Sequence, residues 1–446
     1  NQTRPIVLQQ EEVKDYQQKD SLELVRKSPA YLDSIDRVRN KVTVSNLLIT
    51  GLNISRQKSR SSISVPGLAQ ILSFNTVEGV VVKLNGTYFK RIDTVSISRR
   101  SIAVTPEVRY GFSNKHVNSN LSMVYRFGKK YFNSVSVSGG SDVFQFNNAA
   151  PVGVLGNTLS TLLYRINNLK IYEAVYGRIG FSKGVGSGLT LQAGLDFQDR
   201  VPLENTTDFT LDKGAKDSFT ANHPLPQFNR NIERHQAAVF SLGIGWQPGE
   251  KYIQYPEQTI AMGSGAPKFF LRYTQAVKGI IGSDVGYSKL LFNVRDDINL
   301  KLFGSFNYYL DLGGFLSRDS AAIPDYTHYQ GNMSSLLTGS YLDRFQLVPH
   351  YLFSNTNSFY SLLYSEHHFN GFLTNKIPGL KQLKWNLVTG TNALYRSSGE
   401  YYVEPFVGLE NIFKIIRVDY IWGINNGALL GNGFRIGIKT PFNNIR

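Results

Sequence analysis

Apolar residues alternate with polar or small residues along most of this chain. Three segments near the C-terminus show this most clearly: Leu383, Trp385 and Leu387 oppose Lys384, Asn386 and Gly390; Ile416, Val418, Tyr420 and Trp422 oppose Arg417, Asp419 and Gly423; Phe434, Ile436 and Ile438 oppose Arg435, Gly437 and Lys439. A period of two places successive side chains on opposite faces of a β-strand. Each segment therefore predicts a strand with one apolar and one wet face.

The same alternation continues upstream, almost without a break from Val77 onward. Representative segments are 102–112, 121–127, 189–198, 240–247 and 305–311. We count about 14 to 16 strand candidates, with aromatic residues at many strand ends. This pattern predicts an all-β fold, a transmembrane antiparallel β-barrel, whose strand number is even because both chain ends lie on the periplasmic side. A soluble sandwich rarely needs so many long, aromatic-rich strands.

The connections between these strands are of two kinds, as a barrel requires. Short turns are predicted at 127–131, 183–188 and 411–414, and long irregular loops at about 145–168, 202–234, 248–266 and 317–340. The alternation of short and long connections fails between about 248 and 340. Either the strand assignment is wrong there, or one stretch folds into the lumen as a plug.

The first part of the chain differs from the rest. Residues 8–27 are rich in Gln, Glu, Asp and Lys with spaced apolar positions, which predicts a helix that ends before Pro29, and a second helix is expected at 31–38. We therefore divide the chain into a periplasmic helical lead or linker (1–41), a transition (42–74) with a strand at 42–50, and the barrel (75–446). No secretory signal opens the chain, so a mature or trimmed form is expected.

Composition supports the barrel and narrows the function classes. The 446 residues include 25 Tyr and 28 Phe, and only 18% of residues are charged, against roughly 25% in soluble domains. There is no run of the roughly 20 apolar residues that a spanning helix needs. With no cysteine in the sequence, disulfides, thiol catalysis and thiolate metal sites are excluded. The net charge of +15 is spread along the chain, which argues against nucleic acid and favours contacts with anionic lipid headgroups.

One cluster brings together ionisable residues that could bind a metal or act as acid and base. It is the run Glu366, His367 and His368. Neighbouring residues of a strand point to opposite faces, so Glu366 and His368 share a side that His367 does not. A metal would need further ligands, for which His350 and Glu404 are guesses. We therefore predict a hydrogen-bonded knot at a strand end, with no catalytic, metal or cofactor site.

The chain also resembles a known family. The stretch that carries the resemblance is 364–380, Tyr-Ser-Glu-His-His-Phe-Asn-Gly-Phe-Leu-Thr-Asn-Lys-Ile-Pro-Gly-Leu, supported by segments at 4–6, 20–21, 31–34, 74–79, 402–411 and 413–420. It is similar to outer-membrane proteins of Bacteroidetes of unknown function, in which a barrel usually follows an N-terminal carboxypeptidase-regulatory-like domain. The resemblance implies an outer-membrane barrel, distantly similar to assembly and translocation barrels of the BAM and TAM kind. It implies no catalytic residues, and the N-terminal domain would precede Asn1.

These observations lead to one main hypothesis and three alternatives. The first is a non-enzymatic barrel of the bacterial outer membrane that acts in transport, export or envelope assembly, in contact with lipid, lipopolysaccharide and other outer-membrane or periplasmic proteins. The second makes it an accessory subunit of a larger complex. The others are a barrel enzyme acting on lipid or peptide at the rim, and a soluble carbohydrate-binding β-protein. Inward arginines such as Arg109, Arg126 and Arg417, or an inward loop, could close a pore.

Overall fold

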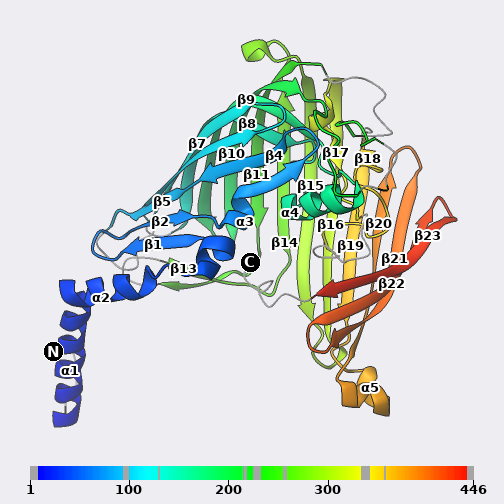
Figure 1. The fold of residues 1–446 in the computed structure, drawn as a ribbon. Helices are drawn as coiled ribbons and strands as arrows, with labels where there is room; N and C mark the ends of the chain where they lie inside the picture. The colour runs from blue at the N-terminus through cyan, green and yellow to red at the C-terminus, as the bar shows by residue number, and fades with distance from the viewer. Residues whose placement is uncertain are drawn as a thin grey trace.

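The structure, a computed structural model, is dominated by one large antiparallel sheet that curves into a barrel wall (Figure 1). It describes residues 9–93, 100–128, 131–212, 214, 218–224, 233–254, 259–332, 342–355 and 358–438. Within these residues the main sheet has nineteen strands. The predicted all-β barrel fold with a helical N-terminus is confirmed.

The strands of the main sheet follow one another in the chain with few interruptions. They are β1 (Leu52–Arg56), β2 (Ser61–Val65), β3 (Leu72–Asn75), β4 (Gly79–Asn85), β5 (Thr87–Arg91), β6 (Ser101–Gly111), β7 (Val117–Phe127), β8 (Asn133–Gln145), β9 (Ile171–Gly186), β10 (Leu189–Pro202), β11 (His235–Trp246), β14 (Lys268–Ala276), β15 (Gly286–Asn299), β16 (Ser305–Ser320), β19 (Tyr360–His368), β20 (Asn386–Arg396), β21 (Tyr401–Ile412), β22 (Ile416–Asn425) and β23 (Ala428–Ile438). Two small hairpins pair β12 (Lys251–Gln254) with β13 (Thr259–Gly263), and β17 (Thr327–His328) with β18 (Ser354–Asn355).

Helices are few and mostly short. They are α1 (Gln10–Lys27), α2 (Pro29–Arg39), η1 (Asn46–Thr50), α3 (Leu68–Ile71), α4 (Val154–Tyr164), η2 (Ile280–Gly282), η3 (Lys301–Phe303), η4 (Ile323–Asp325), η5 (Thr374–Lys376) and α5 (Pro378–Leu383). Within the described part of the chain, none of them is long and apolar enough to cross a membrane.

The short strands at the start of the sheet combine into longer wall strands. β5 pairs with the first half of β6 and β4 with its second half, so β4 and β5 act as one strand interrupted at Gly86. In the same way β2 pairs with β5 and β3 with β4, with α3 between them. These two composite strands precede the long strands β6 to β23, which explains why about 14 to 16 strands were predicted from longer alternating segments.

The two faces of the wall differ as the alternation predicts. On β22 and β23, Asp419 is fully buried on the inner face, whereas Phe434 on the outer face is 63% exposed. Large apolar side chains are similarly exposed on the outer faces of other strands, among them Leu195, Leu242 and Val407. A water-soluble protein rarely exposes a continuous apolar surface of this kind, so the outer face is suited to lipid.

The wall has two different rims. At the loop rim lie the long connections 146–170, 203–234 and 321–359, and at the turn rim lie the short connections 187–188, 300–304 and 413–415. Helix α2 is held at the turn rim, because Asn40 just after it donates to the Ser55 carbonyl (2.8 Å) and Asp36 accepts from the Gln57 backbone N–H (2.9 Å).

One predicted strand is wrong, and another begins later than predicted. Within 42–50, residues 44–50 form helix instead: Thr43 Oγ1 accepts from the Asn46 backbone N–H at 3.2 Å, and the helix ends at Gly51. The strand expected from Leu383 begins only at Asn386, because Pro378 starts α5 and Lys384 ends it with a left-handed backbone (φ 55°). The resemblance segment at 4–6 lies outside the described residues.

The failure of alternation between 248 and 340 has two causes. The hairpin of β12 and β13 makes one turn-rim connection long, and the connection after β16 runs from 321 to 359 rather than from 317 to 340. Much of the described part of this second connection, 321–332 and 342–355, is buried.

Candidate functional site

The interior of the barrel is occupied by part of the connection between β16 and β19. We call residues 321–355 the inward segment, of which 321–332 and 342–355 are described. Figure 1 shows its strands β17 and β18 within the curve of the wall. The largest interior hydrophobic cluster joins it to wall strands β19, β20 and β21.

Aromatic side chains make the densest contact between the inward segment and the wall. Phe345 is fully buried, with its ring centroid 5.5 Å from that of Tyr364 and 5.3 Å from that of Tyr402. The ring centroid of Phe353 lies 4.8 Å from that of Tyr402. Buried aromatic pairs of this kind stabilise a contact beyond the area they bury. The inward segment is therefore packed as a core.

Glu404 of β21 fixes the backbone of the inward segment. Its two carboxylate oxygens accept the backbone N–H groups of Gln346 (2.7 Å) and Leu347 (2.8 Å), and the Tyr402 hydroxyl also donates to it (2.7 Å). From β23, Arg435 Nε donates to the Gln346 carbonyl at 2.8 Å. Because buried backbone groups need partners, these side chains replace the strand ladder that the segment lacks.

A buried ion pair holds the first part of the inward segment to the opposite side of the wall. Arg200 of β10 lies 2.9 Å from Asp325 of η4, and both side chains are buried. The carboxylate also accepts from the Tyr287 hydroxyl (3.1 Å) and the Ala322 backbone N–H (2.9 Å). Burial alone would raise the pKa of Asp325, but the Arg200 charge, the Ala322 hydrogen bond and the Lys289 charge hold it below its usual value. Breaking one side of such a pair leaves a buried, uncompensated charge.

Two histidines of the inward segment, the buried His328 and the partly buried His350, are neutral. His328 Nε2 lies 2.8 Å from the Ile323 carbonyl, which can only accept, and Nδ1 lies 2.8 Å from Ser354 Oγ. Nε2 therefore carries the proton. Burial lowers the pKa of His328 to about 4, and burial together with the Arg344 charge lowers that of His350 to about 4.

The predicted cluster at the end of β19 divides as strand geometry requires. Glu366 and His368 point inward, with His368 Nε2 3.4 Å from Glu366 and Nδ1 3.0 Å from Glu410. Arg417 forms ion pairs with Glu366 and, at 2.8 Å, with Asp419. His367 points the other way, with Nε2 2.9 Å from the Phe303 carbonyl.

This cluster joins three wall strands near the turn rim, and its acidic and basic groups are engaged with one another. Within the described residues no group of three or more histidines and carboxylates is arranged to hold a metal ion. The two guessed ligands lie elsewhere: Glu404 binds backbone amides, and His350 Nδ1 accepts from the Gly331 backbone N–H at 3.3 Å.

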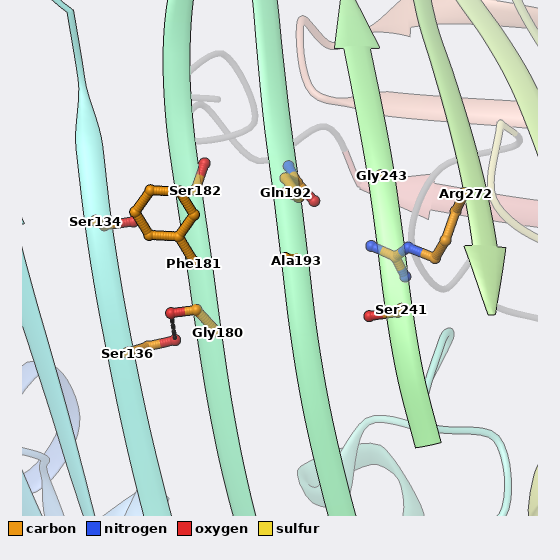
Figure 2. A pocket seen from close by; sticks show the side chains of 10 residues that line it. All are labelled: Ser134, Ser136, Gly180, Phe181, Ser182, Gln192, Ala193, Ser241, Gly243 and Arg272. Atoms are coloured by element: carbon orange, nitrogen blue, oxygen red, sulfur yellow. Dashed lines mark hydrogen bonds between the residues drawn. The ribbon is translucent and has the colours of Figure 1, made fainter. Parts of the chain in front are cut away.

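A hollow lies on the side of the barrel opposite β19 to β21, toward the turn rim. Figure 2 shows this hollow, which is lined mostly by small or polar residues of five neighbouring strands, among them Ser134, Gly180, Gln192, Ser241 and Arg272, and also by Phe181. The strand register places these five on the same face as Asp196. Small inward side chains leave room for water here, so the barrel has a polar vestibule below a packed half.

A comparison with known protein families now identifies the chain. A model of a family of unknown function, the DUF5686 C-terminal domain, matches residues 45–409. The chain belongs to this family. No protein of curated function matches the sequence.

Several solved structures are similar to this DUF5686 domain. They include BamA from Haemophilus ducreyi lacking POTRA domains 1–3 (11% identity, TM-score 0.42, covering 91% of this chain and 76% of that chain). CdiB from Acinetobacter baumannii is similar at 10% identity and a TM-score of 0.37, covering 79% of this chain and 54% of that chain. A mutant Rh. blastica porin is similar at 10% identity and a TM-score of 0.32, covering 78% of this chain and 87% of that chain. The chain thus spans about half the length of the CdiB chain.

The residues that organise the interior of this DUF5686 domain were mostly missed by sequence reasoning. Arg200 and Asp325 carry no local signal, because they are 125 positions apart. One signal was available: residues 345–353, Phe-Gln-Leu-Val-Pro-His-Tyr-Leu-Phe, are too apolar for an exposed loop. Another interior contact that was missed lies in the buried turn 75–78, where the Glu78 carboxylate accepts a hydrogen bond from Arg109 Nε at 2.7 Å.

Proposed function

We propose that this protein is a non-enzymatic outer-membrane barrel that works in export or envelope assembly together with other proteins, and not as an open diffusion pore. The observation that carries the proposal is the packed inward segment. Its aromatic side chains and the Arg200–Asp325 pair fill the loop-rim half of the lumen with a hydrophobic core. A channel for small solutes needs a continuous aqueous path instead.

The outer apolar face supports the location in a membrane. The turn rim then faces the periplasm, with α1 and α2, and the loop rim faces the cell exterior, next to lipopolysaccharide. Helix α1 has no buried residue, so its surface is available to a periplasmic partner. This is why we favour a subunit of a larger assembly over a barrel that acts alone.

The proposal is tested in the native bacterium by removing the gene and restoring it from a plasmid. We expect a set of outer-membrane or surface proteins to decrease, while the uptake rate of small hydrophilic solutes stays unchanged. Slower solute uptake with an unchanged outer-membrane protein profile would show a diffusion pore instead. Fractionation gives an independent check, since carbonate extraction should leave the protein in the outer-membrane fraction.

The enzyme alternative depends on the cluster at the end of β19. Glu366→Gln and His368→Gln would each remove a proton-transfer group while keeping side-chain size. Our proposal predicts that both variants complement the deletion whenever they reach the membrane in folded form. Folded variants that fail to complement would favour chemistry at this rim.

A further inference from the structure

Helix α4 has its polar side toward the protein and its apolar side exposed. The buried residues are Asn157 and Thr161, one turn apart. On the opposite side Leu155 is 61%, Leu159 50% and Leu163 47% exposed. The helix contains no charged residue. A helix on the surface of a soluble protein shows the reverse arrangement.

The polar side of α4 is fully used in holding the helix in place. The Asn157 side-chain oxygen accepts the backbone N–H groups of Asn168 (2.8 Å) and Leu169 (3.0 Å), and its nitrogen donates to Asn167 (3.0 Å). Thr161 Oγ1 lies 2.8 Å from the Asn157 carbonyl. The orientation of the helix is therefore set by specific bonds, and its apolar side is held outward.

Helix α4 covers one end of the sheet. Among the described residues β3 pairs only with β4, and no pair joins β23 to β1 or β3, so these strands border a seam in the wall. Thr158 Oγ1 accepts the Phe74 backbone N–H of β3 at 3.0 Å. An exposed strand edge invites unwanted pairing, and a helix laid along it is one way to block this.

The helix lies on the outer side of this edge. Phe74 stands opposite Val80, on the face of β4 that carries the exposed Leu84. Yet Phe74 is buried, because Phe209 packs on it with ring centroids 5.9 Å apart. The chain beside Phe209 is bonded to the helix, since the Leu211 backbone N–H donates to the Leu162 carbonyl at 2.8 Å.

We propose that α4, with Phe209 and Leu211, is embedded in the membrane and closes the wall beside β3, with its leucines in contact with lipid acyl chains. Its apolar side continues the outer apolar face of β3 and β4, where Leu72 and Val80 are exposed. The absence of charge suits hydrocarbon, where each charged side chain is costly. The inference rests on the membrane location in the proposed function.

Spin labelling tests this directly, because the chain has no cysteine. Leu159→Cys and Leu155→Cys are labelled with a nitroxide in the full chain, reconstituted in phosphatidylcholine vesicles. Leu195→Cys on the outer face of β10 serves as the lipid-facing control, and Glu400→Cys in the loop-rim turn after β20 as the water-facing control. Collisions with oxygen and with a water-soluble nickel chelate are then measured for each site.

We expect both α4 sites to match the Leu195 site, with high oxygen and low nickel accessibility. Nickel accessibility at the level of the Glu400 site would show that α4 faces water and would overturn the inference. Low accessibility to both reagents would mean that protein covers the helix, which also overturns it. If the Leu195 site itself is open to nickel, the membrane location fails, and the inference with it. Two labelled positions guard against one variant that does not fold.

Discussion

Replacing Glu404 should release the inward segment from the wall. The carboxylate is fully buried and accepts three hydrogen bonds, two of them from the backbone of Gln346 and Leu347. In Glu404→Gln one oxygen becomes an NH₂ group, which cannot accept, so one buried donor loses its partner. That loss costs about 2 kcal/mol, and Glu404→Ala, which removes every acceptor, costs about 3 to 5 kcal/mol. A change of 2 kcal/mol shifts a two-state equilibrium roughly thirtyfold.

The assay is the frequency of channel openings of the purified protein in planar bilayers. We expect openings roughly thirty times more frequent in Glu404→Gln than in the wild type, and more again in Glu404→Ala. Glu400→Gln is the matched control: this half-exposed glutamate of the turn after β20 pairs with Arg396, and such pairs are worth about 0 to 1 kcal/mol. Folded Glu404 variants that open no more often than the control would refute this role for the carboxylate.

Two further outcomes follow from the interior. Arg200→Met leaves Asp325 buried without its ion-pair partner. The midpoint temperature of the heat-induced band shift on a gel should therefore fall by the equivalent of about 3 to 5 kcal/mol, and the second change Asp325→Leu should restore most of this loss. Additive losses from the two changes would contradict the pairing. The buried His328 and the partly buried His350 have a pKa of about 4, against 6.5 when exposed, so the released segment binds more protons than the packed one between these pH values. Packing is therefore strongest above about pH 6.5 and should weaken by about 2 kcal/mol per histidine on going to pH 5, with no further loss below about pH 4. Opening frequency measured against pH should rise accordingly, and His328→Gln with His350→Gln should flatten the profile; a wild-type profile independent of pH would contradict this.

The wall could be predicted from the sequence because its signal is local. Alternation along β22 places Arg417 and Asp419 on the face opposite Tyr420, and the structure agrees. The helices at 10–39 were also predicted, since Pro29 and the polar composition mark them. The stretch 42–50 was not, because its five apolar residues fit helix and strand equally, and the Thr43 cap decides for helix.

The interior could not be predicted, since its contacts join distant parts of the chain. Glu404 meets Gln346 across 58 residues, and Gln330 meets Pro151 across 179. The alternation along a strand does not show which inward side chain contacts a distant loop. The cluster around Glu366 shows the boundary between the two cases. The shared face of Glu366 and His368 follows from strand geometry, but the contact with Arg417, 51 positions away, does not.

The conductance of a variant without residues 321–355 tests the central claim most directly. The protein would be purified with a short glycine linker in place of the inward segment and compared with the wild type in planar bilayers, after both show the heat-induced band shift of a folded barrel. We predict only rare, brief openings in the wild type and a stable open channel in the variant, because the polar vestibule then extends through the barrel. A wild type that already conducts steadily, or a folded variant that stays silent, would contradict the account.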